Sequence, residues 1–262
     1  MRKPLVAANW KMHQTRAEVR QFADRLPELS ASVESVICPP AILLPILAEA
    51  LGVDSPVRLG AQNMHPANKG AFTGEHSAPM LRDADARYVI VGHSERRGLF
   101  GEEDDFVAEK VKAALKAGLR PILCIGEVLA EREEGATFRV LRGQLTAALS
   151  ELGAPAPDPA DLVVAYEPIW AIGTGRTASV AQAGEALAFV RERLAEIFGW
   201  AWADRVRLLY GGSATPENAT DLASRPDLDG FLVGGASLDP EKFARIVLAM
   251  HEARAAKKEG PR

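Results

Sequence analysis

Short runs of apolar and β-branched residues alternate along the chain with amphipathic stretches of helical period. This alternation is typical of parallel strands that are covered by helices. Eight such runs predict eight βα units, and therefore an α/β chain folded as a single (β/α)₈ barrel. The predicted strands cover residues 5–9, 33–38, 57–62, 88–92, 120–125, 162–167, 206–210 and 230–233.

The segments between these strands carry helix signals and no clear domain boundary. Thr15 and Glu18 form a capping-box pattern before an amphipathic stretch. The proline-rich segment 153–159 falls between a predicted helix and the sixth strand, so it is interpreted as a connection within one domain. Residues 1–262 are therefore predicted to form one barrel domain, with a charged and frayed tail from about residue 252.

Composition narrows the range of partners. A formal net charge of −4 argues against a nucleic-acid partner, because phosphate-backbone binders usually show a clustered excess of Lys and Arg. No apolar stretch approaches the roughly 20 residues that cross a bilayer, so no membrane partner and a cytoplasmic location are expected. Cys38 and Cys124 lie far apart without a Cys/His cluster, which indicates buried thiols and no metal site.

Polar residues and glycines follow the predicted strands. Active sites of barrels are built from the loops at the carboxyl ends of the strands, so these residues are expected to share one rim. Five loops contribute to this set, which consists of Asn9, Lys11, His93, Glu167, Gly211, Gly212, Ser213, Gly234 and Gly235.

Glu167 closes an apolar strand and precedes a loop with rigid apolar residues and glycines near its end. A lone glutamate at a strand end is more often a solvated rim residue or an ion-pair partner. The loop composition suits a hinged lid that excludes water, and a desolvated carboxylate is a stronger base. Glu167 is therefore the predicted general base.

His93 and Lys11 are the candidate electrophilic groups. His93 leaves a strand at the start of a helical segment, whose amides disfavour an added positive charge and keep the imidazole neutral. The alternative is a structural histidine bonded to backbone. Lys11 offers a cation for negative charge that develops on a substrate, although a single Lys is usually a solvated surface group.

The two glycine clusters offer backbone N–H groups after strands seven and eight, where barrels commonly bind phosphate. No metal-ligand cluster or dinucleotide fingerprint accompanies them, so no cofactor is expected. A carboxylate base, a neutral donor, a cation and a phosphate cradle together suit proton abstraction beside a carbonyl in a small phosphorylated compound.

The order and spacing of five motifs resemble the triosephosphate isomerase family over essentially the whole chain. The motifs are residues 9–12 (NWKM), 92–97 (GHSERR), 166–175 (YEPIWAIGTG), 210–213 (YGGS) and 232–237 (LVGGAS). The resemblance implies interconversion of dihydroxyacetone phosphate and D-glyceraldehyde 3-phosphate through an enediolate, in glycolysis and gluconeogenesis. It also implies that no cofactor takes part.

Roles for individual residues follow from this resemblance. Glu167 would shuttle the proton, His93 would polarise the carbonyl, and Asn9 and Lys11 would support the oxyanion. Backbone groups of Gly173, Ser213, Gly234 and Gly235, together with Asn9 and Lys11, would bind the substrate, while Ile172 and Leu232 would clamp the base and Glu95 would support Lys11.

The resemblance further implies a homodimer in which the long third loop reaches the neighbour's site. Thr73 is the expected reaching residue, and Glu75 is expected to face the neighbour's Arg96; the alternative is a surface loop with incidental charges. Three positions depart from the family pattern. They are His76 and Leu99, which affect the expected interface, and Arg176 at the far hinge of the lid.

Two alternatives stay open on the sequence alone. One is another cofactor-free phosphosugar enzyme with the same fold, and the other is a barrel that has lost catalysis and serves in structure or binding. The joint presence of Lys11, His93 and Glu167 with the lid favours the isomerase.

Overall fold

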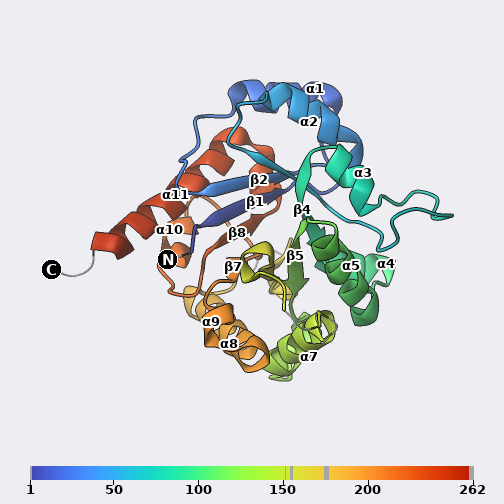
Figure 1. Ribbon diagram of the computed structural model, residues 1–262. Helices are drawn as coiled ribbons and strands as arrows, with labels where there is room; N and C mark the ends of the chain where they lie inside the picture. The colour runs from blue at the N-terminus through green and yellow to red at the C-terminus, as the bar shows by residue number, and fades with distance from the viewer. Residues whose placement is uncertain (1, 151, 154–155, 174–176, 260–262) are drawn as a thin grey trace.

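A computed structural model describes residues 2–150, 152–153, 156–173 and 177–259. In this part of the chain, parallel strands β1 to β8 pair in sequence order and close as a barrel, as predicted (Figure 1). Closure is made by β1, which pairs with β2 on one side and with β8 on the other. The strands are β1 (Leu5–Asn9), β2 (Glu34–Cys38), β3 (Arg58–Ala61), β4 (Ala86–Val91), β5 (Arg120–Ile125), β6 (Val163–Tyr166), β7 (Arg207–Tyr210) and β8 (Gly230–Val233).

Helices surround the barrel (Figure 1). The connections also contain short 3₁₀ turns. The predicted capping box is present, because the Thr15 backbone N–H donates to Glu18 Oε2 over 2.7 Å at the start of α1. The α-helices are α1 (Arg16–Arg25), α2 (Leu44–Leu51), α3 (Ala78–Asp83), α4 (Ser94–Phe100), α5 (Asp104–Lys116), α6 (Leu129–Glu133), α7 (Thr137–Leu149), α8 (Val180–Phe198), α9 (Trp200–Ala203), α10 (Ala219–Ala223) and α11 (Pro240–Glu259). The 3₁₀ turns are η1 (Ala41–Leu43), η2 (Pro159–Asp161), η3 (Ile169–Ala171) and η4 (Gly235–Leu238).

The predicted charged tail begins within α11, which is helical to Glu259. Arg254 lies in this stretch and is buried, where its guanidinium donates to the carboxylate of Asp229. Burial of this ion pair holds the end of the helix against the barrel. Residues 260–262 lie outside the described residues, as does Arg176.

Alternation along each strand divides the apolar side chains between two cores. Successive side chains of a strand point to opposite faces, so alternate residues fill the barrel interior and the layer beneath the helices. On β1, Leu5 and Ala7 belong to the inner cluster, and Val6 and Ala8 belong to the outer one. Two packed cores therefore hold the strand ends in fixed positions.

Inside the barrel, β3 has a glycine where the side chain of Cys38 on β2 packs closely against it. A Cβ on Gly60 would lie 2.5 Å from Sγ of Cys38, so strand β3 accepts no larger residue there without movement. Cys38 and Cys124 are both free and buried, as predicted, and burial raises the pKa of each thiol.

The amino ends of the strands carry a second layer of charged residues. Glu34 begins β2 and accepts from Arg207, which begins β7, over 2.6 Å. Burial raises the pKa of Glu34, but the charges of Arg207 and Arg120 and hydrogen bonds from Tyr88 and Arg207 outweigh it, so the net shift is downward. This pair ties two strands that are not neighbours in the barrel.

Glu34→Gln should destabilise the protein by about 3 kcal/mol at neutral pH, because it leaves the Arg207 guanidinium buried without its carboxylate. The pKa of Glu34 is lower in the folded protein than in the unfolded chain. The ionised carboxylate therefore stabilises the fold at pH values above the pKa of the unfolded chain, and this stabilisation is lost as the pH falls through the pKa of the folded protein. The free energy of unfolding, measured in urea, should therefore fall less between pH 7 and pH 3 in the variant than in the parent protein. An equal fall in the free energy of unfolding of both proteins would contradict this account.

Candidate active site

The predicted residues at the carboxyl ends of the strands meet at one cavity of about 280 Å³. β1 delivers Asn9, β6 is followed by Glu167, and the glycine clusters follow β7 and β8. Those predicted site residues that line the cavity are Asn9, Lys11, His93, Glu167, Ile172, Gly173, Ser213, Leu232, Gly234 and Gly235.

Glu167 is almost fully buried, with 2% of its surface exposed. Its Oε2 accepts from the backbone N–H of Ser94 over 2.9 Å, and its Oε1 lies 3.0 Å from Nε2 of His93. The carboxylate is thus fixed by the segment that follows β4. Both oxygens have donors, so its burial leaves neither lone-pair set unsatisfied.

The backbone at Glu167 also depends on a glycine that the sequence reasoning passed over. A Cβ on Gly126 would lie 1.7 Å from the carbonyl oxygen of Glu167. The loop after β5 can approach this closely only because residue 126 has no side chain. Gln144 holds Gly126 from the far side, accepting from its N–H and donating to its carbonyl.

His93 occupies the N-cap position of α4, and its Nδ1 accepts from the backbone N–H of Glu95 over 3.2 Å. An imidazolium has no acceptor, so this bond favours a neutral ring with its proton on Nε2, facing Glu167. Burial also lowers the pKa of His93, but the charge of Glu167 and the hydrogen bond to it raise the pKa by more. The sequence prediction of a neutral ring considered the helix alone and did not include this carboxylate.

Lys11 is held in an uncommon conformation beside His93. Its φ of 53° lies in the left-handed region, where a non-glycine residue costs roughly 1–2 kcal/mol. Its backbone N–H donates to Oδ1 of Asn9 over 3.1 Å, and its Nζ lies 2.7 Å from Oε1 of Glu95. Glu95 therefore contacts Lys11, and its supporting role stays a prediction.

The glycine clusters present free backbone donors. Within the described residues, the N–H groups of Ser213, Gly234 and Gly235 donate to no other group. All three residues line the cavity. Unpaired N–H groups around a small cavity are suited to bind an anion such as a phosphate.

The lid segment is anchored at its beginning by a buried carboxylate that was not predicted. Glu127 is fully buried, and its Oε1 accepts from Trp170 Nε1 over 2.9 Å and from the Tyr166 hydroxyl over 3.1 Å. The backbone N–H of Ile169 donates to the Glu127 carbonyl over 3.1 Å. Of the lid, residues 168–173 are described, and residues 174–176 lie outside the described part.

Thr73, Glu75 and Arg96 lie outside the cavity. Thr73 and Glu75 are exposed on the loop between β3 and α3, which projects away from the barrel (Figure 1). Arg96 is paired within the chain, with its Nε 2.5 Å from Oε1 of Glu102.

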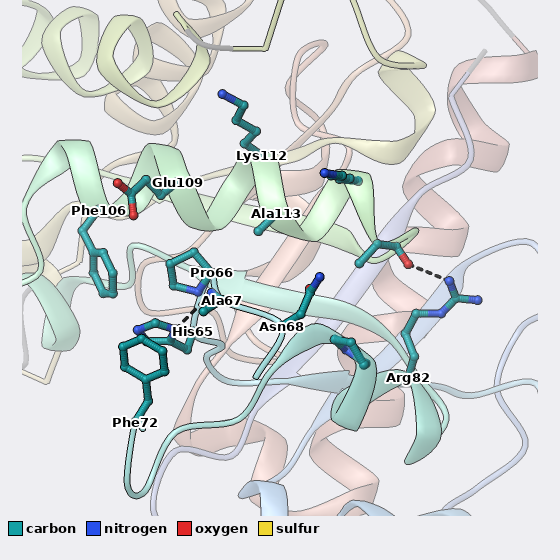
Figure 2. Close-up of a pocket in the computed structure, with 13 residues that line it drawn as sticks. His65, Pro66, Ala67, Asn68, Phe72, Arg82, Phe106, Glu109, Lys112 and Ala113 are labelled. Atoms are coloured by element: carbon teal, nitrogen blue, oxygen red, sulfur yellow. Dashed lines mark hydrogen bonds between the residues drawn. The ribbon is translucent and has the colours of Figure 1, made fainter. Parts of the chain in front are cut away.

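A second and larger cavity, of about 1180 Å³, lies beside this projecting loop and not at the strand ends that carry Glu167 (Figure 2). The rings of His65 and Phe72 stack there with centroids 3.8 Å apart, and Phe106 of α5 lies next to them. The stack fixes the loop against α5. Polar groups suited to proton transfer converge at the smaller cavity instead.

Comparison with known proteins gives the family. The family model for triosephosphate isomerase matches residues 4–250. The chain belongs to the triosephosphate isomerase family. Curated relatives named triosephosphate isomerase include those of Symbiobacterium thermophilum (55% identical, covering 97% of this chain and 100% of the relative), Carboxydothermus hydrogenoformans (50%, 94% and 98%) and Chloroflexus aurantiacus (51%, 94% and 99%).

Membership in the triosephosphate isomerase family confirms the resemblance that the motifs carried, and with it an isomerase that acts on triose phosphates. Neither the other phosphosugar enzyme nor the barrel without catalysis is favoured by these comparisons. Among the described residues, no group of three or more metal-ligating side chains could hold a metal ion. No described helix is long and apolar enough to cross a membrane.

Gln62 is a further residue that the sequence reasoning did not assign to the site. It follows β3, and its Nε2 donates to the carbonyl of Lys11 over 2.8 Å and to that of Cys38 over 2.9 Å. One amide group thereby ties the strained residue Lys11 to the end of β2. No local motif marks this role, because both acceptors are backbone atoms of distant segments.

Gln62→Met keeps the length of the side chain but removes both donors. We expect kcat to fall about tenfold, because Lys11 loses one of its restraints, and stability to fall by about 1–3 kcal/mol. Steady-state kinetics and urea unfolding measure the two effects, with the exposed Gln21→Met on α1 as control. A kcat within twofold of the parent would contradict the restraint.

Proposed function

We propose that this protein interconverts dihydroxyacetone phosphate and D-glyceraldehyde 3-phosphate, a step of glycolysis and gluconeogenesis, with Glu167 as the base. The observation that carries the proposal is the convergence of a buried carboxylate, an imidazole and a lysine on a cavity lined by unpaired N–H groups. These groups suit proton transfer beside a carbonyl in a small phosphate ester.

The proposed reaction moves one proton between neighbouring carbons. Glu167 removes a proton from the carbon beside the carbonyl, and the bonding pair forms the double bond of an enediolate. The carbonyl oxygen takes up negative charge, which Lys11, Asn9 and the Nε2–H of His93 stabilise. The proton then returns from Glu167 to the other carbon while His93 relays protons between the two oxygens, so no redox partner is needed.

The remaining site residues bind the substrate and enclose it. The phosphate accepts hydrogen bonds from backbone groups of Gly173, Ser213, Gly234 and Gly235, which line the cavity. Ile172 and Leu232 line the same cavity as Glu167 and exclude water from it. The chain acts as one domain, residues 1–262, and works in the cytoplasm without a cofactor.

The base assignment is tested by Glu167→Gln, which keeps the size of the side chain and removes its basicity. Purified parent protein should interconvert the two triose phosphates in a coupled assay without added metal, and the variant should lose about 10³-fold in kcat. Glu192→Gln, an exposed position on α8, serves as the matched control. Turnover by Glu167→Gln within tenfold of the parent would refute the assignment.

We also propose a homodimer in which the projecting loop reaches the neighbour's site. Exposed apolar side chains follow three of the first four strands: Met12 after β1 is 93% exposed, Ile42 in η1 is 81% exposed and Leu99 in α4 is 78% exposed. An apolar set of this kind marks an interaction surface. Thr73 enters the neighbour's site, and Glu75 pairs with the neighbour's Arg96 in addition to the Glu102 contact within the chain. The departures at Leu99 and His76 lie at this interface.

Thr73→Arg places an additional charge on the reaching loop and should weaken the dimer, because an unpaired charge in a desolvated contact costs several kcal/mol. In sedimentation velocity at micromolar concentration, the parent should have twice the mass of the chain, and the variant should shift toward the monomer. Thr220→Arg, exposed on α10, is the control. A parent that sediments as a monomer would refute the dimer.

A further inference from the structure

A cavity of about 650 Å³ opens at the amino ends of the strands, opposite the candidate active site. Arg120 and Arg207 begin strands β5 and β7, so barrel closure brings them to the same end. Nine residues line this cavity, of which two are acidic, Glu34 and Asp204. Six are cationic, namely Arg2, Lys3, Arg120, Arg205, Arg207 and Arg254.

Two of these arginines are more than nine-tenths buried, which distinguishes the cavity from a solvated surface patch. Arg207 is 6% exposed and Arg254 is 9% exposed. Arg254 Nε has no hydrogen-bond partner within the described residues, although it is buried. An unpaired buried donor is costly, so the positive charge of Arg254 is not fully compensated within the described residues.

Nearby carboxylates do not fully balance this charge. Asp158, Asp161 and Asp229 pair with arginines of the cavity from outside its lining. Together with Glu34 and Asp204 they make five acidic groups against six cations. Lys3 has no ion-pair partner among the described residues. The surplus of positive charge is local, because the chain as a whole has a net charge of −4.

The hydrogen-bond geometry favours phosphate oxygens as the ligand atoms. Arginine forks match phosphate and pair with it in bidentate fashion. Arg207 already uses its fork for Glu34 and for the Tyr88 hydroxyl, over 2.6 and 3.0 Å. The partly exposed Arg120 and Arg205, with Lys3, retain donors for a second anion at the mouth of the cavity.

We propose that this cavity is a second anion site that binds a diphosphate group, either as free pyrophosphate or as part of a nucleoside diphosphate. Several cations around one cavity suit two linked phosphates better than one. The cavity and the candidate active site lie at opposite ends of the strands, and β1 (Leu5–Asn9) spans about 13 Å at about 3.3 Å per step between residues. The two sites are therefore separate.

Isothermal titration calorimetry with inorganic pyrophosphate tests the site in the full chain. Lys3→Gln/Arg205→Gln removes two cations that are exposed enough to leave folding intact. Arg20→Gln/Lys242→Gln is the matched control, because both residues are exposed and Arg20 also faces a single carboxylate. Pyrophosphate inhibition of triose phosphate turnover reports the candidate active site separately.

We expect the parent and the control to bind pyrophosphate at a site whose occupancy does not inhibit turnover. The charge-removal variant, Lys3→Gln/Arg205→Gln, should bind pyrophosphate at that site at least tenfold more weakly. Inhibition at the active site should stay within twofold in all three proteins. ADP titrated in parallel distinguishes a nucleotide site, if it binds more tightly than pyrophosphate, from a site for the free anion. Equal affinity in parent and charge-removal variant, or no binding beyond the inhibitory site, would overturn the proposal.

Discussion

Closure of the parallel barrel is the constraint on which every other feature depends. Each strand runs in the same direction, so all carboxyl ends meet at one rim and all amino ends at the other. Residues that are more than 150 positions apart, such as Asn9 and Glu167, then line one cavity. The same closure gathers Glu34 and Arg207 at the opposite end. The direction of the strands, and not proximity in sequence, therefore decides which polar and charged residues meet at each end of the barrel.

The strands and the site were predictable for the same physical reason. Apolar runs mark strands because buried parallel strands are apolar on both faces, and three of the eight predicted ranges agree with the structure to the residue: 5–9, 120–125 and 230–233. Elsewhere the observed strand starts or ends one or two residues away, as at β3, where Gln62 leaves the strand and turns its amide toward Lys11. Polar residues directly after these runs could be assigned to the rim without coordinates.

Residues whose partners are backbone atoms or distant side chains could not be predicted in this way. Gly126 matters because of a carbonyl 41 positions later in the chain, and Glu127 matters because of Trp170 and Tyr166. Neither contact leaves a periodic or local pattern in the sequence. The direct contact of His93 with Glu167 belongs to the same group, since it joins the ends of β4 and β6.

This last contact sets a condition on the proposed chemistry. Glu167 accepts from His93 Nε2 and from the Ser94 N–H, so its lone pairs face donors and not a carbon acid. A substrate that places its carbonyl oxygen against His93 replaces the carboxylate as acceptor and frees Glu167 for the neighbouring carbon. Its phosphate, bound by the unpaired N–H groups, supplies binding energy for that exchange. The hydrogen bond between His93 and Glu167 is thus broken by the ligand that needs the base.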